Sequence, residues 1–432
     1  MNRRQFVRQG LALAAGAGFA AAAGPALGAG APRATAPGAA AAALLVPGYR
    51  PYRARVGGRP IDQDPAFRRN LPRGYDGATT LVTRLDPDGR VRRALMPVRG
   101  HQIVPHPGGG PAFFNSIEGD GFCTFDPATL ALDRVLTPHR PGFVGGGHAA
   151  YSADGRHLFV LERRTPGAYS GTPADHFGVV AVRDAATLAV VDAFSCHGIG
   201  PHDIALTDGG RTLAVANYGS TDWGDSEDGT PPNVIEPSVT LLDAASGALR
   251  RKVAGRAGRY EIRHLACPPA GPLVAIQTRL VPDAQERAEV PAGTVYEADD
   301  TVDPRLSFTP APLLAVPAGG GPPAEVACPD GARFRQGQSI VYEPEHDEVI
   351  VTFASGHALA VLDAATAALR RVVRTDRLGL YYPRGLALLP GGRYAVSGSW
   401  RGLYVFDRGS HAPRPDETRH VTFFEHSHLT PV

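Results

Sequence analysis

Cysteine and lysine are scarce in this sequence, and both shortages narrow what the protein can be. The cysteines are Cys123, Cys196, Cys267 and Cys328, and none has the Cys-x-x-Cys spacing of a zinc ribbon or a haem attachment. In an oxidising compartment they can form up to two disulfides, with Cys267–Cys328 geometrically conceivable, or remain buried thiols. Lys252 is the only lysine, and the formal net charge is +2. This balance argues against nucleic-acid binding, which leaves a basic face.

Several functional motifs are also missing. After the first 30 residues no run approaches the roughly 20 apolar residues that a membrane span requires. No serine has a Gly-x-Ser-x-Gly context, so no nucleophile elbow is visible. No glycine-rich loop precedes a predicted helix, which argues against a nucleotide site.

The first 43 residues are not predicted to belong to the fold. Arg3 and Arg4 precede an apolar Ala/Gly/Leu run, and small residues follow at 27–29. This pattern predicts a twin-arginine export signal over residues 1–29, with an ordinary secretory signal or a weak membrane anchor as alternatives. Residues 30–43 form an Ala/Pro/Gly tether. We therefore expect an exported, periplasmic protein.

The rest of the chain repeats one hairpin. Most copies begin with a histidine and have a turn glycine seven residues later, and the anchor positions lie 44 to 74 residues apart. The aligned anchors are His101, His148, His202, His264, Gln338, Arg384 and His428. A period near 45 residues with four short strands per unit is typical of a β-propeller blade.

Seven anchors predict an all-β, seven-bladed β-propeller over residues 44–432. His428 has one short strand after it, so its blade must be completed by N-terminal strands within 43–49, 78–86 and 91–98. Closure of a blade between the two termini removes open sheet edges. Asp-containing turns join the last two strands of several units, as in the sequence SVTLLDAASGALRRKV.

Four long loops separate the second and third strands of their blades. They cover residues 50–77, 163–177, 217–237 and 279–304. In a propeller these loops share one face with the connections that lead into each innermost strand. The loops and the anchor residues should therefore lie at the same end of the molecule, where ligand sites concentrate.

Three motifs connect the sequence with a known family. They are GIGPHDIAL (198–206), EIRHLA (261–266) and GGGHAAYSADGRHLFVLE (145–162). With these, the chain resembles the domain of unknown function 1513 family of periplasmic, YVTN-like, seven-bladed propellers. The resemblance implies export and an association with imelysin-type iron-uptake proteins. It supplies no established activity.

Histidine at the aligned anchors predicts a metal site. Sevenfold pseudosymmetry brings His101, His148, His202, His264 and His428 around one axial mouth. Imidazoles without thiolates suit iron or copper among other metals. The alternative is that these histidines pack neighbouring blades together, because side chains of the innermost strand point mainly toward adjacent blades.

Five further residues are predicted to support a ligand at this mouth. Glu162 and Asp203 can hold a ligating ring through its second nitrogen, and Asn217 ends a strand near the same face. Arg263 and Arg384 can clamp an anionic ligand. All five can equally be ordinary turn or ion-pair residues.

These observations favour a non-catalytic metal-binding propeller in iron or copper homeostasis, with imelysin-type proteins as partners. A second hypothesis is enzymatic, either metal-dependent oxidoreduction or a lactonase-like hydrolysis that uses His202, His264, Arg263 and Glu162. A third is a protein-interaction scaffold that uses the four long loops. The sequence does not choose the metal, the substrate or the oligomeric state.

Overall fold

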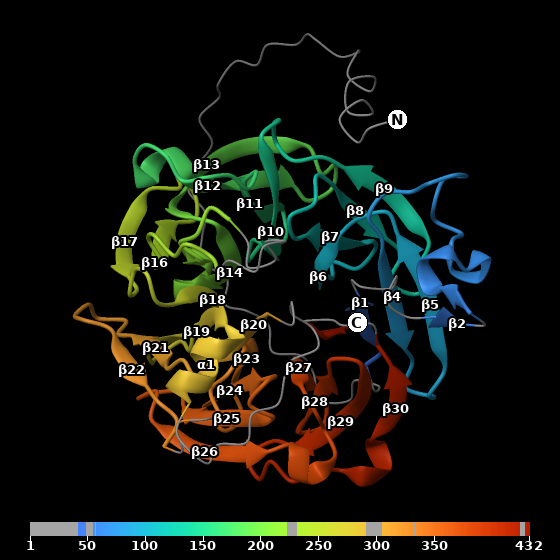
Figure 1. Ribbon diagram of the computed structural model, residues 1–432. Coiled ribbons are helices and arrows are strands. Elements are labelled where there is room, and N and C mark those ends of the chain that lie inside the picture. Colours follow the sequence, from blue (N-terminus) through green and yellow to red (C-terminus); the bar gives the residue numbers. More distant parts are fainter. Residues whose placement is uncertain are drawn as a thin grey trace. The chain divides into compact units, whose positions relative to one another are not determined.

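Seven antiparallel sheets surround a central axis in the computed structural model (Figure 1). Six of the sheets have four described strands and one has five. The structure describes residues 42–48, 55–56, 58–222, 231–290, 305–329, 331, 333–423 and 428–432. The prediction of an all-β, seven-bladed propeller is confirmed. The predicted export signal, and the tether up to residue 41, lie outside the described residues.

The first blade joins the two ends of the chain, as predicted. Its strands, in spatial order, are β31 (Thr430–Pro431), β1 (Leu44–Gly48), β4 (Thr80–Leu85) and β5 (Val91–Met96). Next to this pairing, Ala43 and Val432 exchange two backbone hydrogen bonds of 3.1 and 2.9 Å. The closure leaves no unpaired edge between the first and last strands of the ring.

Blades two to four each follow the chain order outward from the axis. Blade two contains β6 (Gly100–Val104), β7 (Ala112–Ser116), β8 (Phe122–Phe125) and β9 (Leu132–Leu136). Blade three contains β10 (Phe143–Tyr151), β11 (His157–Arg164), β12 (Phe177–Asp184) and β13 (Val190–Ile199). Blade four contains β14 (Pro201–Thr207), β15 (Thr212–Asn217), β16 (Ser238–Asp243) and β17 (Leu249–Ala254).

Blades five to seven complete the ring. Blade five contains β18 (Glu261–Ala266), β19 (Leu273–Pro282), β21 (Leu313–Val316) and β22 (Ala324–Val326), with β20 (Leu306–Thr309) paired to β19. Blade six contains β23 (Gly337–Glu343), β24 (Glu348–Phe353), β25 (Ala358–Asp363) and β26 (Leu369–Arg374). Blade seven contains β27 (Pro383–Leu389), β28 (Arg393–Gly398), β29 (Arg401–Asp407) and β30 (Arg419–Thr422).

Aspartate side chains close the turns between the third and fourth strands, as the sequence predicts. Each carboxylate accepts a hydrogen bond of 2.7–2.9 Å from the backbone N–H three residues later. The four aspartates are Asp126, Asp184, Asp243 and Asp363. These turns satisfy backbone groups locally and fix the register of the outer hairpins.

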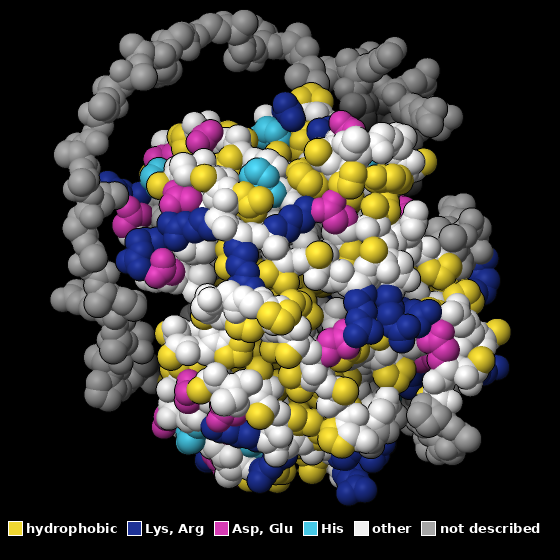
Figure 2. Space-filling view, turned by 90° about the vertical axis from the view of Figure 1, so that its left-hand side faces the viewer, with side chains coloured by type: hydrophobic (Ala, Val, Ile, Leu, Met, Phe, Trp, Pro, Cys, Tyr) yellow, Lys and Arg dark blue, Asp and Glu magenta, His cyan; other side chains and the backbone are white. Residues whose placement is uncertain are grey.

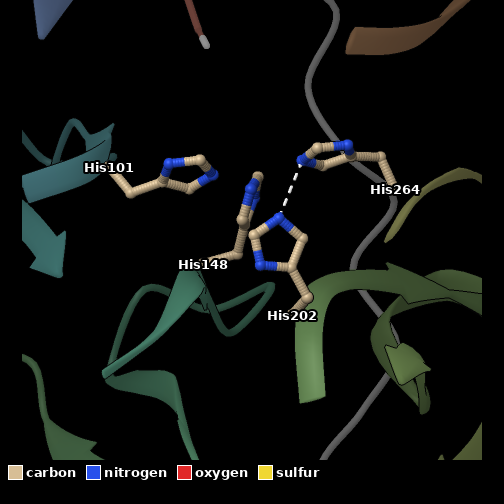
Figure 3. Close-up of side chains that lie close together, drawn as sticks. All are labelled: His101, His148, His202 and His264. Carbon is tan, nitrogen blue, oxygen red and sulfur yellow. Dashed lines mark hydrogen bonds between the residues drawn. The ribbon is translucent and has the colours of Figure 1, made fainter. Parts of the chain in front are cut away.

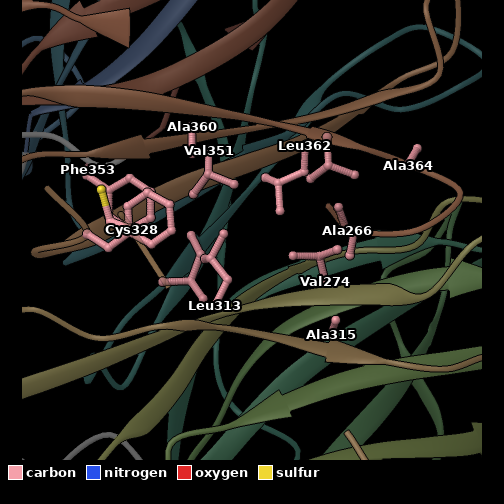
Figure 4. Close-up of a cluster of buried hydrophobic side chains, with 14 residues drawn as sticks. Ala266, Val274, Leu313, Ala315, Cys328, Val351, Phe353, Ala360, Leu362 and Ala364 are labelled. Atoms are coloured by element: carbon pink, nitrogen blue, oxygen red, sulfur yellow. The ribbon is translucent and has the colours of Figure 1, made fainter. Parts of the chain in front are cut away.

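Apolar side chains from adjacent blades fill the space between the sheets. In the cluster between blades five and six, Leu313 and Val274 face Val351 and Phe353 (Figure 4). The rings of Phe353 and Phe334 are stacked, with centroids 4.4 Å apart. Each blade therefore depends on its neighbours for its core.

The insertion predicted as a loop at 279–304 is partly ordered structure. Strand β19 continues to Pro282, and a short helix, α1 (Asp283–Glu289), follows it. Glu286 of this helix is buried and pairs with Arg335 at 2.6 Å. The insertion is thereby attached to the connection that leads into blade six.

No helix among the described residues is long and apolar enough to cross a membrane. On the face shown in Figure 2, Lys and Arg side chains lie in several separate groups, with Asp and Glu side chains beside some of them.

The anticipated Cys267–Cys328 disulfide is absent. Cys123, Cys196 and Cys267 are free thiols. Cys328 packs among the apolar residues between blades five and six. Burial raises the pKa of the Cys196 and Cys267 thiols to about 12, which makes the thiolate scarce at neutral pH.

We therefore expect the native thiols to resist alkylation. With iodoacetamide at about pH 8, the folded protein should be labelled slowly, because the reactive species is the thiolate. In urea without a reductant, mass spectrometry should count as many labelled cysteines as in urea with a reductant. Extra labels that appear only after reduction would reveal a disulfide and contradict the structure.

Candidate metal centre

The innermost strands change register at the anchor positions. The shifts fall between Gly100/Gln102, Gly145/Ala149, Pro201/Asp203, Ile262/Leu265, Gly337/Ile340 and Pro383/Leu386. A β-bulge inserts an unpaired residue and redirects its side chain. An anchor residue therefore does not follow the strict in-and-out alternation that would point it at a neighbouring blade. The bulges explain how the anchor histidines meet near the axis.

Glycine before the anchor makes room for the rings. Gly147 has φ +114°, and a Cβ atom there would lie 2.8 Å from the His202 ring and 3.1 Å from the His101 ring. Other residues rarely adopt this backbone conformation, and here they would also collide with the imidazoles. The glycine run before His148 is thus a packing requirement of the cluster.

The five anchor histidines come together, four of them as a square of rings. Neighbouring centroids are 5.0 Å apart for His101–His202, 4.7 Å for His202–His264, 5.0 Å for His264–His428 and 4.6 Å for His428–His101. The His101–His264 diagonal is 6.3 Å. His148 lies 4.6–5.2 Å from each of the four. Together the rings resemble the base and apex of a square pyramid.

Ring nitrogens face one another across this arrangement (Figure 3). One nitrogen from each of His101, His148, His202 and His264 falls within a mutual distance of 4.8 Å. The Nε2 atoms of His202 and His264 are 3.1 Å apart, and those of His428 and His101 are 3.0 Å apart. Two nitrogens at ~2.1 Å from one ion and at right angles to it would lie about 3.0 Å apart. The spacing therefore suits a shared metal ion.

The cluster is buried, and three of its rings are held neutral. His101, His148, His202 and His264 are 1–6% exposed. Burial lowers the pKa of His101, His202 and His264 well below the ordinary value, and the other rings add to the effect. Neutral imidazole is the form that coordinates metals.

A hydrogen bond holds the His202 ring, and a close carboxylate faces the His148 ring. The Nδ1 of His202 donates to the Gly146 carbonyl at 2.9 Å, which leaves the lone pair of Nε2 directed at the cluster. His148 Nδ1 lies 2.8 Å from Asp203 Oδ1. The Asp203 carboxylate also accepts from the backbone N–H groups of Ile204 and Leu265, at 2.8 and 3.0 Å. Asp203 thus stands where the sequence placed it, beside a ring of the cluster.

Some ring nitrogens lack a partner. Among the described residues, His148 Nε2 and His264 Nδ1 make no hydrogen bond although both atoms are buried. A buried polar atom without a partner costs free energy, on the order of 1–3 kcal/mol. The Nδ1 of His148 lies beside Asp203, whereas its Nε2 has no hydrogen-bond partner in the described part of the chain. This Nε2 is therefore available to bind a metal ion.

An aromatic and cationic layer borders the cluster on another side. The Tyr218 ring lies 4.5 Å from the His202 ring, and the guanidinium carbons of Arg163 and Arg263 each lie 5.3 Å from the Tyr218 centroid. Arg163 pairs with Glu118 at 3.3 Å and Arg263 with Glu261 at 2.9 Å. Arg263 was predicted near the site, whereas Arg163 and Tyr218 were not.

Glu162 and Asn217 lie elsewhere, which corrects their predicted roles. The Glu162 carboxylate accepts from the His139 backbone N–H at 2.9 Å, and its Oε2 is 2.6 Å from His139 Nδ1. The Asn217 amide bonds within blade four, including Thr240 at 3.3 Å. Side chains alternate along a strand, so the residues that reach the cluster are Arg163 and Tyr218, one position later in each case.

The position of Glu162 away from the histidine cluster weakens the lactonase-like hypothesis. Its carboxylate is occupied by His139 and also lies 3.6 Å from Arg183. Glu162 therefore does not lie with His202, His264 and Arg263, as the lactonase-like hypothesis requires. Arg384, the other predicted anion clamp, is buried, and its carbonyl accepts from Thr352 at 2.8 Å.

A cavity of about 230 Å³ adjoins the histidines. It is lined by His148, His264 and His428 together with Asp203, Ser339 and Gln102, and by the apolar residues Leu265, Ile340, Val341, Leu386 and Leu429. The cluster can therefore hold a metal ion in contact with an enclosed space.

Comparison with known proteins gives the family and the fold. The model of the family described as "Protein of unknown function (DUF1513)" matches residues 94–428, a span that contains all five histidines. No curated protein matches. Among solved structures, the hydrazine synthase of Kuenenia stuttgartiensis is similar, with a TM-score of 0.50 and 15% sequence identity over 81% of this chain and 94% of that chain. At this identity the likeness shows the fold alone.

The depressed histidine pKa values predict how the stability of the metal-free protein depends on pH. The unfolded rings titrate near pH ~6.5, whereas the native rings stay neutral to lower pH, so the unfolded state binds more protons below that value. The free energy of unfolding should fall as the pH drops from about 7 to about 5, by up to about 1.4 kcal/mol per pH unit for each ring. Urea titrations across this range measure the slope.

The variant His101→Phe tests the origin of this slope. It removes one titrating ring and keeps an aromatic side chain, so its pH slope should be smaller than that of the wild type. Equal slopes in the two proteins would show that His101 is not held neutral by burial.

Proposed function

The chain belongs to the DUF1513 family, whose function is unknown, and we propose that it is a metal-binding propeller that holds one transition-metal ion among its five axial histidines. The observation that carries this proposal is the convergence of buried imidazoles with Nε2–Nε2 distances of 3.0 and 3.1 Å. The unpartnered Nε2 of His148 supports it.

Copper is the metal that the donor set favours. Tetragonal arrangements of nitrogen donors are typical of Cu(II) and Ni(II), and copper heads the general affinity order of the divalent first-row ions. The four nitrogens within 4.8 Å of one another, with His428 Nε2 at 3.0 Å from His101 Nε2, are compatible with that preference. Iron is the second candidate, because imidazole also suits it.

We further propose that the protein works in the periplasm, in iron or copper homeostasis. The Arg3-Arg4 pattern supports twin-arginine export, which suits proteins that leave the cytoplasm already folded. The resemblance of the motifs around His202 and His264 to imelysin-associated propellers supports an imelysin-type partner. Pull-down of a tagged, exported chain from periplasmic extract tests this partnership.

Elemental analysis of the protein purified after native export tests the metal site. We expect roughly one equivalent of copper or iron per chain, since one nitrogen from each of four rings lies within 4.8 Å of the others. The double variant His148→Ala/His202→Ala removes two of the five rings and should lose the metal. Electron paramagnetic resonance of the copper-loaded wild type should show nitrogen coordination.

A matched control is His106→Ala/His157→Ala, which removes two histidines of blades two and three that lie outside the cluster. It should keep the metal. A wild type that stays metal-free after export and also fails to take up added copper, iron and zinc would refute the proposal. The histidines would then serve only to pack the blades.

The glycine before His148 offers a second test. In Gly147→Ala, the new methyl group would meet the His202 and His101 rings, so the ligands should be displaced. Copper affinity should fall by at least about tenfold, comparable with the loss of a supporting contact in known metal sites. Competition with a chromogenic chelator measures the affinity.

Gly142→Ala is the control for backbone strain. Gly142 also has a positive φ, of +85°, but a Cβ atom there meets nothing within 4 Å. Both variants should lose some stability, whereas only Gly147→Ala should lose copper affinity. An equal loss of affinity in the two variants would attribute the effect to strain and not to the rings.

A further inference from the structure

We propose that the cavity beside the histidines receives a small molecule that binds directly to the metal. This inference rests on the proposed metal site and adds a ligand to it. It makes the centre an open one, able to bind an exogenous molecule, in contrast to a closed site that only stores its ion.

The position of the cavity carries the first step. Three of the five proposed ligands, His148, His264 and His428, line it. An ion within reach of these rings is therefore within reach of a molecule in the cavity. Five imidazoles leave one position of a six-coordinate ion for such a molecule.

The size of the cavity limits the ligand. About 230 Å³ is far more than the ~10–15 Å³ needed for one water molecule. It is less than the ~300–1,000 Å³ of pockets that enclose drug-sized ligands. The occupant should therefore be a molecule of a few heavy atoms.

The metal would supply the positive charge of the site. Among the described residues, the lining holds one carboxylate, Asp203, and no lysine or arginine. The guanidinium groups of Arg163 and Arg263 are near Tyr218 instead. A divalent ion bound by neutral imidazoles would therefore be the cation that pairs an anionic donor in the cavity, and it would also bind a neutral one.

The remaining lining suits a molecule with an apolar body. Leu265, Ile340, Val341, Leu386 and Leu429 form apolar walls, and Ser339 and Gln102 add polar groups. Mostly apolar walls with a few placed polar groups are typical of small-molecule sites. The geometry therefore points to a small donor molecule that coordinates through one atom.

The experiment uses the full mature chain loaded with Cu(II), at a pH where imidazole is uncharged. Imidazole is the neutral probe and azide is the anionic probe, and both are followed by visible absorption and electron paramagnetic resonance. Imidazole should change the copper spectrum with a saturable response and leave the metal content unchanged after desalting. Azide should also change the copper spectrum, because the copper ion would pair its charge.

Cavity-filling variants locate the binding. Ile340→Phe and Leu386→Phe, on strands of different blades, should each keep the copper and weaken imidazole binding at least about tenfold. Leu389→Phe is the control, because it enlarges a leucine of the same strand β27 that does not line this cavity. Circular dichroism checks that each variant folds.

The outcomes separate this inference from the proposed function. Copper retained with imidazole binding unchanged in a folded filled variant would overturn the cavity as the ligand site. A copper spectrum that neither imidazole nor azide changes in the wild type would overturn the open centre, and that arm needs no variant. A wild type that binds no metal would refute the metal site itself, and this inference with it.

Discussion

The site depends on one backbone feature, the bulge at the start of six of the seven innermost strands. Regular alternation would send an anchor side chain toward the next blade, where it would serve only to pack sheets. The extra residue at the bulge lets His101 and His202 leave that alternation, and Gly147 keeps the neighbouring backbone clear of their rings. Because the same irregularity recurs around the ring, side chains from separate blades reach one place.

Bringing these rings together has a cost that shapes their chemistry. A protonated imidazole in this buried cluster would lose its hydration and face other rings, so the neutral form is favoured. Neutral rings in turn leave lone pairs directed at one another, and hydrogen bonds satisfy only part of them. A bound metal ion would give these lone pairs a partner, and the rings would need neither water nor a proton. The burial that disfavours protons is therefore the property that suits the cluster to a metal.

The sequence predicted the repeat much better than it predicted the surroundings of the site. The anchors, the Asp-containing turns and the shared terminal blade are local patterns with a fixed period, and the structure confirms them. The bulges are not visible in a strand pattern, so the direction of the anchor side chains stayed open between the axis and the adjacent blade. For the same reason Glu162 was chosen over Arg163, since one step along a strand reverses the face.

The burial of histidines outside the cluster depends on contacts that the sequence pattern does not show. His411 lies on a turn of an outer strand, where solvent exposure is expected, yet it is buried and its Nε2 is 3.1 Å from Glu348. His357 is likewise buried. Such contacts join segments distant in the sequence, and composition alone does not show which turn another blade covers.

The two anchors that are not histidine explain the shape of the centre. Gln338 and Arg384 belong to blades six and seven, which separate His264 of blade five from His428 of blade one. The cavity draws Ser339, Ile340, Val341 and Leu386 from these same two blades. Histidine at all seven anchors would surround an ion on every side. Because blades six and seven have no anchor histidine, space is left beside the five rings. A molecule would have to approach the metal from that side.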